Sequence, residues 1–150
     1  NPPKYSAAST QKIQRRISQP LLDRIDLTID VQPVPIEDLQ KKPDENAHSS
    51  ASILDRVVRA RERQVERFAS LSISTNKEMS VKEIDMLCPL DDTSAQILKM
   101  AVDRMGLSAR GYHRTIKVAR TIADLADSDN IAKEHVAEAL QYRQNISAED

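Results

Sequence analysis

The chain has 150 residues, a net charge of −1 and a single cysteine, Cys88. The near-neutral charge excludes attraction of the whole chain to nucleic acid or to a membrane surface, and the lone cysteine excludes an intrachain disulfide. No apolar run approaches the roughly 20 residues that cross a bilayer. We therefore expect a cytoplasmic protein in a reducing compartment, without a membrane partner.

Aromatic residues make up only 3% of the chain. The core must then consist of aliphatic side chains, which favours packed helices over a β-sandwich or barrel. The composition predicts a mainly α protein.

Residues 1–50 form the first predicted region. Residues 1–10 predict a loop and residues 11–18 a short helix. From Ile25 to Val31 apolar residues alternate with Asp and Thr, and this period of two predicts a strand. A single strand needs a neighbour for its backbone groups, so we interpret residues 1–50 as the tail of a larger α/β domain, ending in a polar linker over residues 41–50.

Residues 51–79 form an arginine-rich connecting helix and a loop. The pair Ser52 and Asp55 predicts the start of the helix, which extends to Ala69. The residues expected on its buried side are apolar: Ile53, Leu54, Val57, Val58, Val65 and Phe68.

Residues 80–150 predict a compact bundle of four helices. Three helix starts are indicated by capping residues, Ser80, Asp92 and Ser108, and the fourth helix covers Ile131–Arg143. Gly106 is expected to stop the second of these helices.

Motifs for nucleotide or metal binding are missing from the sequence. A phosphate-binding loop needs two glycines followed by Lys-Ser or Lys-Thr, whereas the chain has only Gly106 and Gly111, neither in such a context. His48, His113, His135 and Cys88 lack the spacing of a zinc site. The chain alone is therefore expected to bind no ATP or metal and to be inactive as an ATPase.

The segment RRISQPLLDRIDLTIDV, residues 15–31, resembles the segment RISGPLLDRIDLHIEV of magnesium-chelatase-like AAA+ ATPases of the competence and branch-migration type. The resemblance implies that Arg24 is an arginine finger, which reaches the γ-phosphate of ATP in a neighbouring subunit (in trans). The alternative from the residues alone is a surface ion pair, because carboxylates flank Arg24 on both sides.

The segment LSARGYHRTIKVARTIADLADSDNIAKEHVAEALQYR, residues 107–143, is similar to the end of the lid domain in the same family. By this resemblance Arg110 is sensor 2, which contacts the γ-phosphate of ATP bound by its own subunit (in cis). A cation in the first turn of a helix is disfavoured by the helix dipole, which favours a functional role over a solvated or paired arginine.

The arginines of the connecting helix allow two interpretations. Arg56, Arg59, Arg61, Arg63 and Arg67 could contact phosphates, or they could form a solvated face, since Asp55 and Arg59 have the spacing of a helical ion pair. The solvated face is favoured.

The resemblance implies the C-terminal portion of an AAA+ ATPase: a helical lid with a remnant strand of the α/β nucleotide-binding core. In the full-length protein, ATP and Mg²⁺ would bind between core and lid, neighbouring subunits would form a ring, expected to be a hexamer, and hydrolysis would drive remodelling of DNA. The alternatives are remodelling of a metal chelatase and a helical interaction module without an ATP role.

Overall fold

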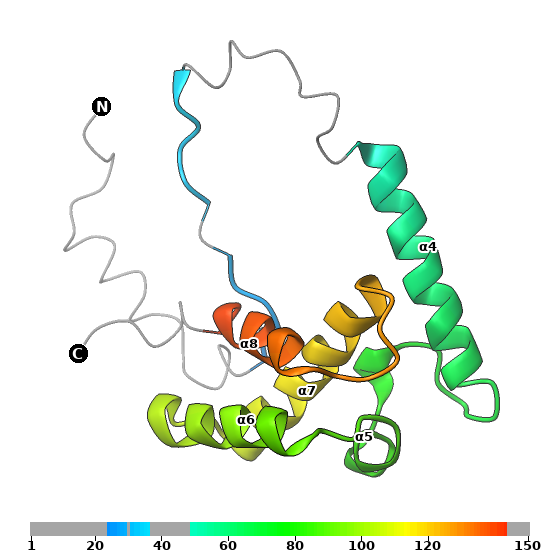
Figure 1. Ribbon diagram of the computed structural model, residues 1–150, viewed down its shortest axis with the longest axis vertical. Coiled ribbons are helices and arrows are strands. Elements are labelled where there is room, and N and C mark those ends of the chain that lie inside the picture. Colours follow the sequence, from blue (N-terminus) through cyan, green and yellow to red (C-terminus); the bar gives the residue numbers. More distant parts are fainter. Residues whose placement is uncertain (1–23, 30, 37–48, 144–150) are drawn as a thin grey trace.

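The computed structural model describes residues 24–29, 31–36 and 49–143. The described chain is mainly helical, as predicted (Figure 1). Its elements are α4 (Ser50–Arg67), the short 3₁₀ helix η1 (Asn76–Glu78), α5 (Val81–Leu87), α6 (Asp92–Met105), α7 (Ala109–Leu125) and α8 (Lys133–Gln141). The helix predicted over residues 11–18 and most of the linker over residues 41–50 lie outside the described residues.

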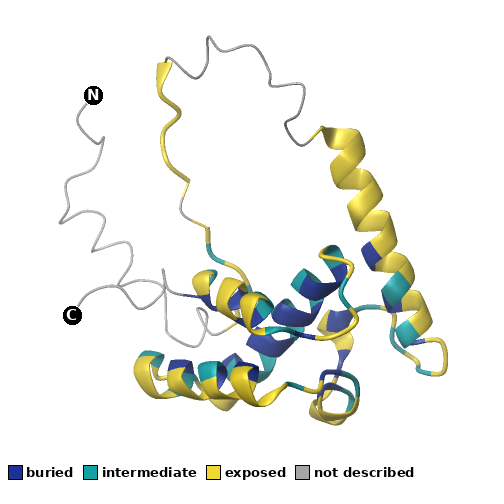
Figure 2. Cartoon of the chain, viewed as in Figure 1, coloured by how far each residue is buried: buried dark blue, intermediate teal, exposed yellow. Residues whose placement is uncertain are grey.

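Helix α7 is the centre of the bundle. It contacts α4, η1, α5 and α8, and α6 contacts α8. Ala119 and Ala123 of α7 and Ala139 of α8 are fully or almost fully buried; their short side chains let helices approach closely. Figure 2 shows the buried residues concentrated along α7 and on the faces turned toward it.

Local signals in the sequence set the helix ends. Ser80 and Glu83 form the predicted capping box before α5, and Ser108 caps α7 by accepting a hydrogen bond from the Gly111 N–H at 3.1 Å. Gly106 ends α6 with a left-handed φ of 60°, a conformation that glycine adopts without steric cost.

Two predicted caps are displaced toward the N-terminus. Helix α6 is capped by Asp91, whose carboxylate accepts from the Ser94 N–H at 2.6 Å, so Asp92 is the first helical residue. Helix α4 is capped by Ser49 and not by Ser52. The Ser49 hydroxyl accepts a hydrogen bond from the Ser52 N–H at 3.1 Å.

The last helix is shorter than the predicted Ile131–Arg143. Ile131 forms an isolated parallel bridge with Leu90, and α8 begins at Lys133. The bridge holds the backbone of Ile131 extended, so the helix can begin only after it.

The strand predicted over Ile25–Val31 is wrong for the residues that the structure describes. Residues 24–29 and 31–36 contain no strand. No neighbouring strand is available to them in the described chain, and the N–H of Thr28 donates instead to the carbonyl of Tyr142 at 2.9 Å. The alternating apolar residues therefore remain exposed, from 38% for Ile25 to 84% for Val31.

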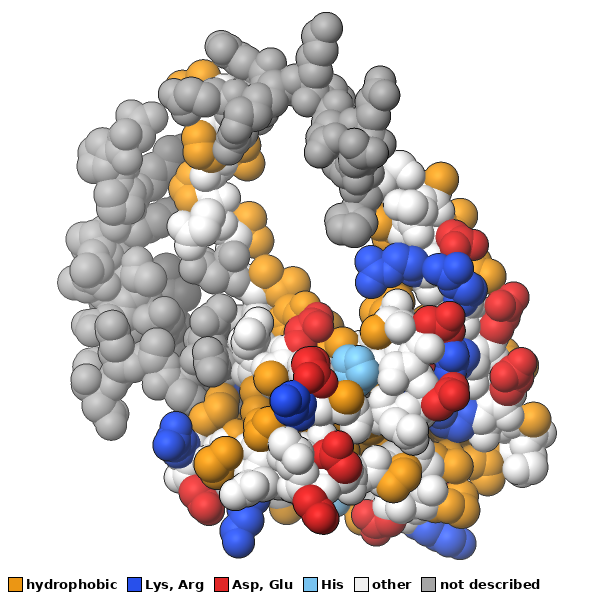
Figure 3. Space-filling model, in the orientation of Figure 1, with side chains coloured by type: hydrophobic (Ala, Val, Ile, Leu, Met, Phe, Trp, Pro, Cys, Tyr) orange, Lys and Arg blue, Asp and Glu red, His pale blue; other side chains and the backbone are white. Residues whose placement is uncertain are grey.

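The apolar stripe predicted to be buried on α4 is also largely exposed. Ile53, Leu54, Val57 and Val58 are 41–62% exposed, whereas Ala60, Gln64 and Phe68 are buried. Only the C-terminal half of α4 packs on the bundle, and the N-terminal half extends away from it (Figure 1). Figure 3 shows apolar side chains at the surface of this half and of the described residues up to 36.

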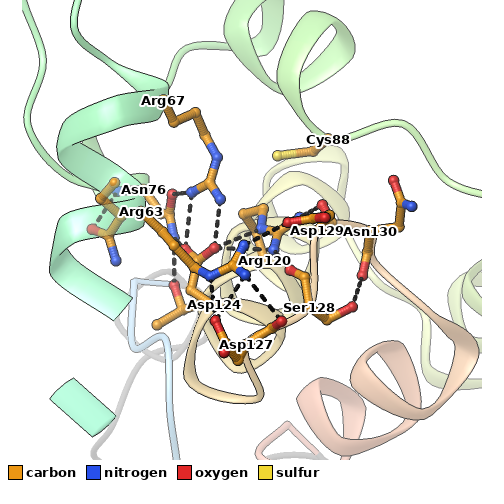
Figure 4. A network of polar contacts seen from close by, with 12 residues as sticks. Arg63, Arg67, Asn76, Cys88, Arg120, Asp124, Asp127, Ser128, Asp129 and Asn130 are labelled. Carbon is orange, nitrogen blue, oxygen red and sulfur yellow. Dashed lines mark hydrogen bonds and ion pairs between the residues drawn. The ribbon is translucent and has the colours of Figure 1, made fainter. Parts of the chain in front are cut away.

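A buried charge network fixes α4 to α7 (Figure 4). The fully buried carboxylate of Asp124 accepts hydrogen bonds from Arg67 at 2.5 and 2.9 Å, from the Arg120 Nε at 3.1 Å and from the Asn76 amide at 2.8 Å. Arg120 also donates to the carbonyls of Ser128 and Asp129, at 2.6 and 2.7 Å. One carboxylate thus links α4, η1 and α7, while Arg120 adds the turn before α8.

We predict that Asp124→Asn destabilises the fold by about 3–5 kcal/mol, because it leaves two largely buried guanidinium groups without a carboxylate. Urea denaturation followed by circular dichroism measures this. Asp103→Asn, an exposed aspartate of α6, is the matched control and should change stability by less than about 0.5 kcal/mol. An Asp124→Asn variant as stable as this control would contradict the role of the network.

Burial of Cys88 generates a second prediction. The thiol is 4% exposed, its Sγ lies 3.9 Å from the Met79 Sδ, and desolvation raises its pKa to about 11 although Arg120 and Arg67 oppose the shift. In the unfolded chain a cysteine ionises near a pKa of about 8.5. Above about pH 8.5 the thiol ionises in the unfolded chain but stays protonated in the folded protein. The contribution of Cys88 to stability is therefore fully present below about pH 8.5 and is lost as the pH rises toward 11.

We expect the free energy of unfolding to fall by about 2 kcal/mol more between pH 8 and pH 10 in the wild type than in Cys88→Ala, at about 1.4 kcal/mol per pKa unit. The same burial should make the native thiol react with Ellman's reagent far more slowly than the urea-unfolded chain. If the free energy of unfolding falls equally in both proteins between pH 8 and pH 10, Cys88 ionises as readily in the folded state as in the unfolded state.

Candidate phosphate-binding site

Arg110 lies in the first turn of α7, immediately after the Ser108 cap. It is exposed, and no ion pair or hydrogen bond joins it to another described residue. The first turn of α7 contains no acidic residue, so the helix dipole there is not offset by a carboxylate. An anion at this place would be stabilised by both the guanidinium group and the helix N-terminus.

A hollow with a volume of about 340 Å³ lies next to this helix start. Its basic lining comes from two separate parts of the chain: Arg24 from the described segment 24–29, and Arg110, Arg114 and Lys117 from α7. The remaining lining residues are Met79, Ser80, Val81, Ile84 and His113, and none of them is acidic. The hollow is therefore suited to an anionic group.

The cations of the hollow differ in their contacts. Arg24 is exposed and has no partner among the described residues. Arg114 pairs with Asp26 through a Nε to Oδ1 distance of 2.6 Å. Lys117 donates to the Lys77 carbonyl at 2.9 Å, and desolvation lowers its pKa, with Arg114 adding to the shift and Asp26 opposing it. Arg24 and Arg110 are thus the two groups most available to a ligand.

The structure brings Arg24 and Arg110, the two predicted site residues, to one hollow. The contributions of Arg114 and Lys117 were missed from sequence, although a signal for them exists. Residues 110, 114 and 117 are spaced by four and three positions, which puts them on the same face of a helix. The contact of Arg114 with Asp26 shows that this arginine is paired as well as part of the lining.

The histidines of the described chain have structural contacts. The Nδ1 of His113 donates to the Ala109 carbonyl at 2.8 Å, since a carbonyl can only accept. The Nδ1 of His135 accepts the N–H of Ala132 at 3.0 Å, at the start of α8. In the described ranges no group of three or more His, Cys, Asp or Glu side chains is arranged to hold a metal ion; His48 lies outside them.

The arginines of α4 support the interpretation as a paired and solvated face. Arg59 pairs with Asp55 at 3.2 Å, as the spacing predicted, with both side chains exposed. Arg63 bonds to Asp127 and Asp129, each at 2.7 Å, and Arg67 belongs to the Asp124 network. Basic and acidic side chains lie interspersed along this helix in Figure 3.

Comparison with known proteins agrees with the helical arrangement. Residues 47–143 match the family model described as the C-terminal part of the magnesium chelatase subunit ChlI. The chain belongs to this magnesium-chelatase-like family. Among the helices that the structure describes, none in this family member is long and apolar enough to cross a membrane.

Several relatives in the family align with nearly the whole chain. It is 42% identical to the competence protein ComM of Haemophilus influenzae over 142 residues, which are 93% of this chain and 27% of ComM. It is 39% identical over 134 residues to the protein YifB of Escherichia coli, 89% of this chain and 26% of YifB. An uncharacterized protein of Mycobacterium bovis is 32% identical over 139 residues, 93% of this chain and 27% of that protein. The chain thus spans about a quarter of the length of these relatives.

Proposed function

We propose that this chain is the lid portion of a magnesium-chelatase-like AAA+ ATPase, and that the hollow beside α7 receives the phosphate chain of ATP. The observation that carries the proposal is Arg110, an exposed guanidinium at a helix N-terminus without a described partner, in a hollow that also exposes Arg24. A helix N-terminus offers no electrostatic stabilisation to an arginine. Phosphate oxygens, in contrast, would be stabilised there by both the helix dipole and the guanidinium group.

Each group would have a different part in hydrolysis. The planar guanidinium of Arg110 can donate two parallel hydrogen bonds to the γ-phosphate. The position of the lid would then depend on whether the γ-phosphate is bound. Arg24 would stabilise the charge of the transition state, a contribution of about 10³–10⁵ in rate for arginine fingers. The lining has no carboxylate, so Mg²⁺ would be held by the phosphates and by residues elsewhere in the longer protein.

The shared hollow affects the assignment of each arginine to the ATP of its own subunit or of a neighbouring one. The resemblance assigns Arg110 to the ATP of its own subunit and Arg24 to that of a neighbour in a ring, expected to be a hexamer. Because both arginines line one hollow of one chain, the geometry favours a single triphosphate that meets both. A ring of subunits is required whenever either arginine acts in trans.

DNA is the proposed substrate of the remodelling activity. The net charge of −1 supports no binding by the chain as a whole, so DNA contacts would belong to local patches or to the rest of the protein. The similarity to a relative named as a competence protein favours DNA as the substrate. The name of the family model favours the alternative, a metal chelatase.

We expect Arg110→Ala to lower the ATP turnover of the full-length protein at least about 10-fold, and Arg24→Ala to lower it about 10³-fold or more. Steady-state phosphate release measures both. Arg104→Ala, an exposed arginine near the end of α6, is the matched control and should retain full turnover. Wild-type turnover in both site variants would leave the helical interaction module as the better description.

Mixing the Arg24→Ala and Arg110→Ala variants tests whether the two arginines share a nucleotide. If one chain supplies both groups to one ATP, every site in a mixed ring lacks one arginine and activity does not return. If Arg110 acts in cis and Arg24 in trans, some sites combine an intact Arg110 with an intact Arg24 from the neighbour, and turnover is partly restored.

The substrate is tested by titrating labelled duplex DNA with the full-length protein at several salt concentrations. For a DNA remodeller, the logarithm of affinity should fall linearly with the logarithm of salt, with a slope of about −0.9 per phosphate contacted. Fluorescence anisotropy measures this slope. Absence of DNA binding at low salt would favour the chelatase alternative.

A further inference from the structure

We propose that Asp26 and Arg114 form a positioning pair, which holds the segment carrying Arg24 against the helix carrying Arg110. The inference rests on the proposed function of those two arginines. It adds a role for two residues that need not touch the phosphate themselves: they set where Arg24 lies relative to Arg110.

The ion pair itself is the first observation. The Arg114 Nε lies 2.6 Å from the Asp26 Oδ1, and the side chains are only 21% and 38% exposed. Partial burial limits screening by salt, so this contact should be stronger than a fully exposed pair. Lys117, the other cation near Asp26, already donates to the Lys77 carbonyl at 2.9 Å. Arg114 is therefore the group that anchors Asp26.

A second contact holds the same segment from another side. The N–H of Thr28 donates to the carbonyl of Tyr142 at 2.9 Å, just after the end of α8. Between the two contacts, Leu27 lines an apolar hollow of about 260 Å³ together with Val118, Ile122 and Leu125 of α7. A segment without secondary structure is thus tied to both α7 and α8.

The positions along the chain make this contact relevant to catalysis. Arg24 precedes Asp26 by two residues, which span at most about 7 Å. Arg110 precedes Arg114 by four residues of α7, a rise of about 6 Å. The ion pair therefore joins the two phosphate-directed arginines by a short covalent path on each side. Its loss would weaken the attachment of Arg24 while leaving Arg110 on helix α7.

The main experiment compares Asp26→Asn with Asp26→Glu in the full-length protein. We expect Asp26→Asn to lower kcat about 10- to 100-fold, since a misplacement of about 1 Å can cost about 10²-fold. The KM for ATP should change little, because an arginine finger acts mainly in the transition state. Asp26→Glu keeps the charge and should recover most of kcat. Asp55→Asn, which breaks the exposed pair with Arg59, is the control and should leave kcat unchanged.

A double variant separates the pair from independent effects. Arg114→Gln loses the same contact and also removes a cation from the hollow. If Asp26 acts through Arg114, adding Asp26→Asn to Arg114→Gln lowers kcat no further. If the fold-losses in kcat of the two single variants multiply in the double variant, the positioning role is overturned. An unchanged kcat in Asp26→Asn would also overturn it.

Amide exchange of Thr28 in the 150-residue chain tests the attachment without ATP. Asp26→Asn should speed this exchange relative to the wild type and Asp26→Glu, and salt should speed it in the wild type but not in Asp26→Asn. Exchange unaffected by Asp26→Asn would overturn the inference even if Arg24 and Arg110 prove essential. Conversely, full turnover in both Arg24→Ala and Arg110→Ala would overturn the proposed function, and the positioning role with it.

Discussion

The arrangement of the helical bundle depends on one buried carboxylate, that of Asp124. Its side chain is fully buried and accepts hydrogen bonds from arginines of α4 and α7 and from Asn76 of η1. A charge can be buried at this depth only when charged donors replace the water that it loses. Two guanidinium groups that meet one carboxylate leave a net positive charge. The carbonyls of the turn after α7 offset part of it by accepting hydrogen bonds from Arg120. The carboxylates of Asp127 and Asp129 lie nearby and pair with Arg63. The connecting helix thus has a defined direction with respect to the bundle.

Helix α7 links this network to the candidate site. It has 17 residues and is therefore about 25 Å long at about 1.5 Å per residue. The network holds its C-terminal end, where Arg120 and Asp124 lie, while Arg110 lies at its N-terminal end. Small buried residues along its length, such as Ala119 and Ala123, pack it closely against its neighbours. Helix α7 thus connects the position of Arg110 to the α4 network through one continuous, closely packed element.

Family membership and site geometry contribute different information. The match over residues 47–143 establishes the magnesium-chelatase-like family, but it says nothing about which anion the hollow accepts. The chemistry of the hollow comes from its lining, four basic side chains without a carboxylate, contributed partly by a segment that precedes the matched region. The exposed apolar residues of α4 and of the segment up to Ile36 have no cover in the described chain.

The sequence alone determined the features that depend on neighbouring residues. The Ser80–Glu83 box, the Ser108 cap and the left-handed Gly106 follow from hydrogen bonds and φ preferences within a few positions, so their places could be read directly. The resemblance of two segments identified Arg24 and Arg110 as candidates. Only the tertiary structure decided which apolar stripes are buried: Val57 and Val58 have the periodicity of a buried face, yet they are exposed because nothing in the described chain packs on them. The tertiary structure also decided that Ile25–Ile29 is not a strand, that Arg67 and Arg120 share Asp124, and that Asp26 meets Arg114 across 88 positions of sequence. The physical reason is the same in each case, because burial and ion pairing depend on what lies across space from a residue, and a local pattern records only what lies beside it in the chain.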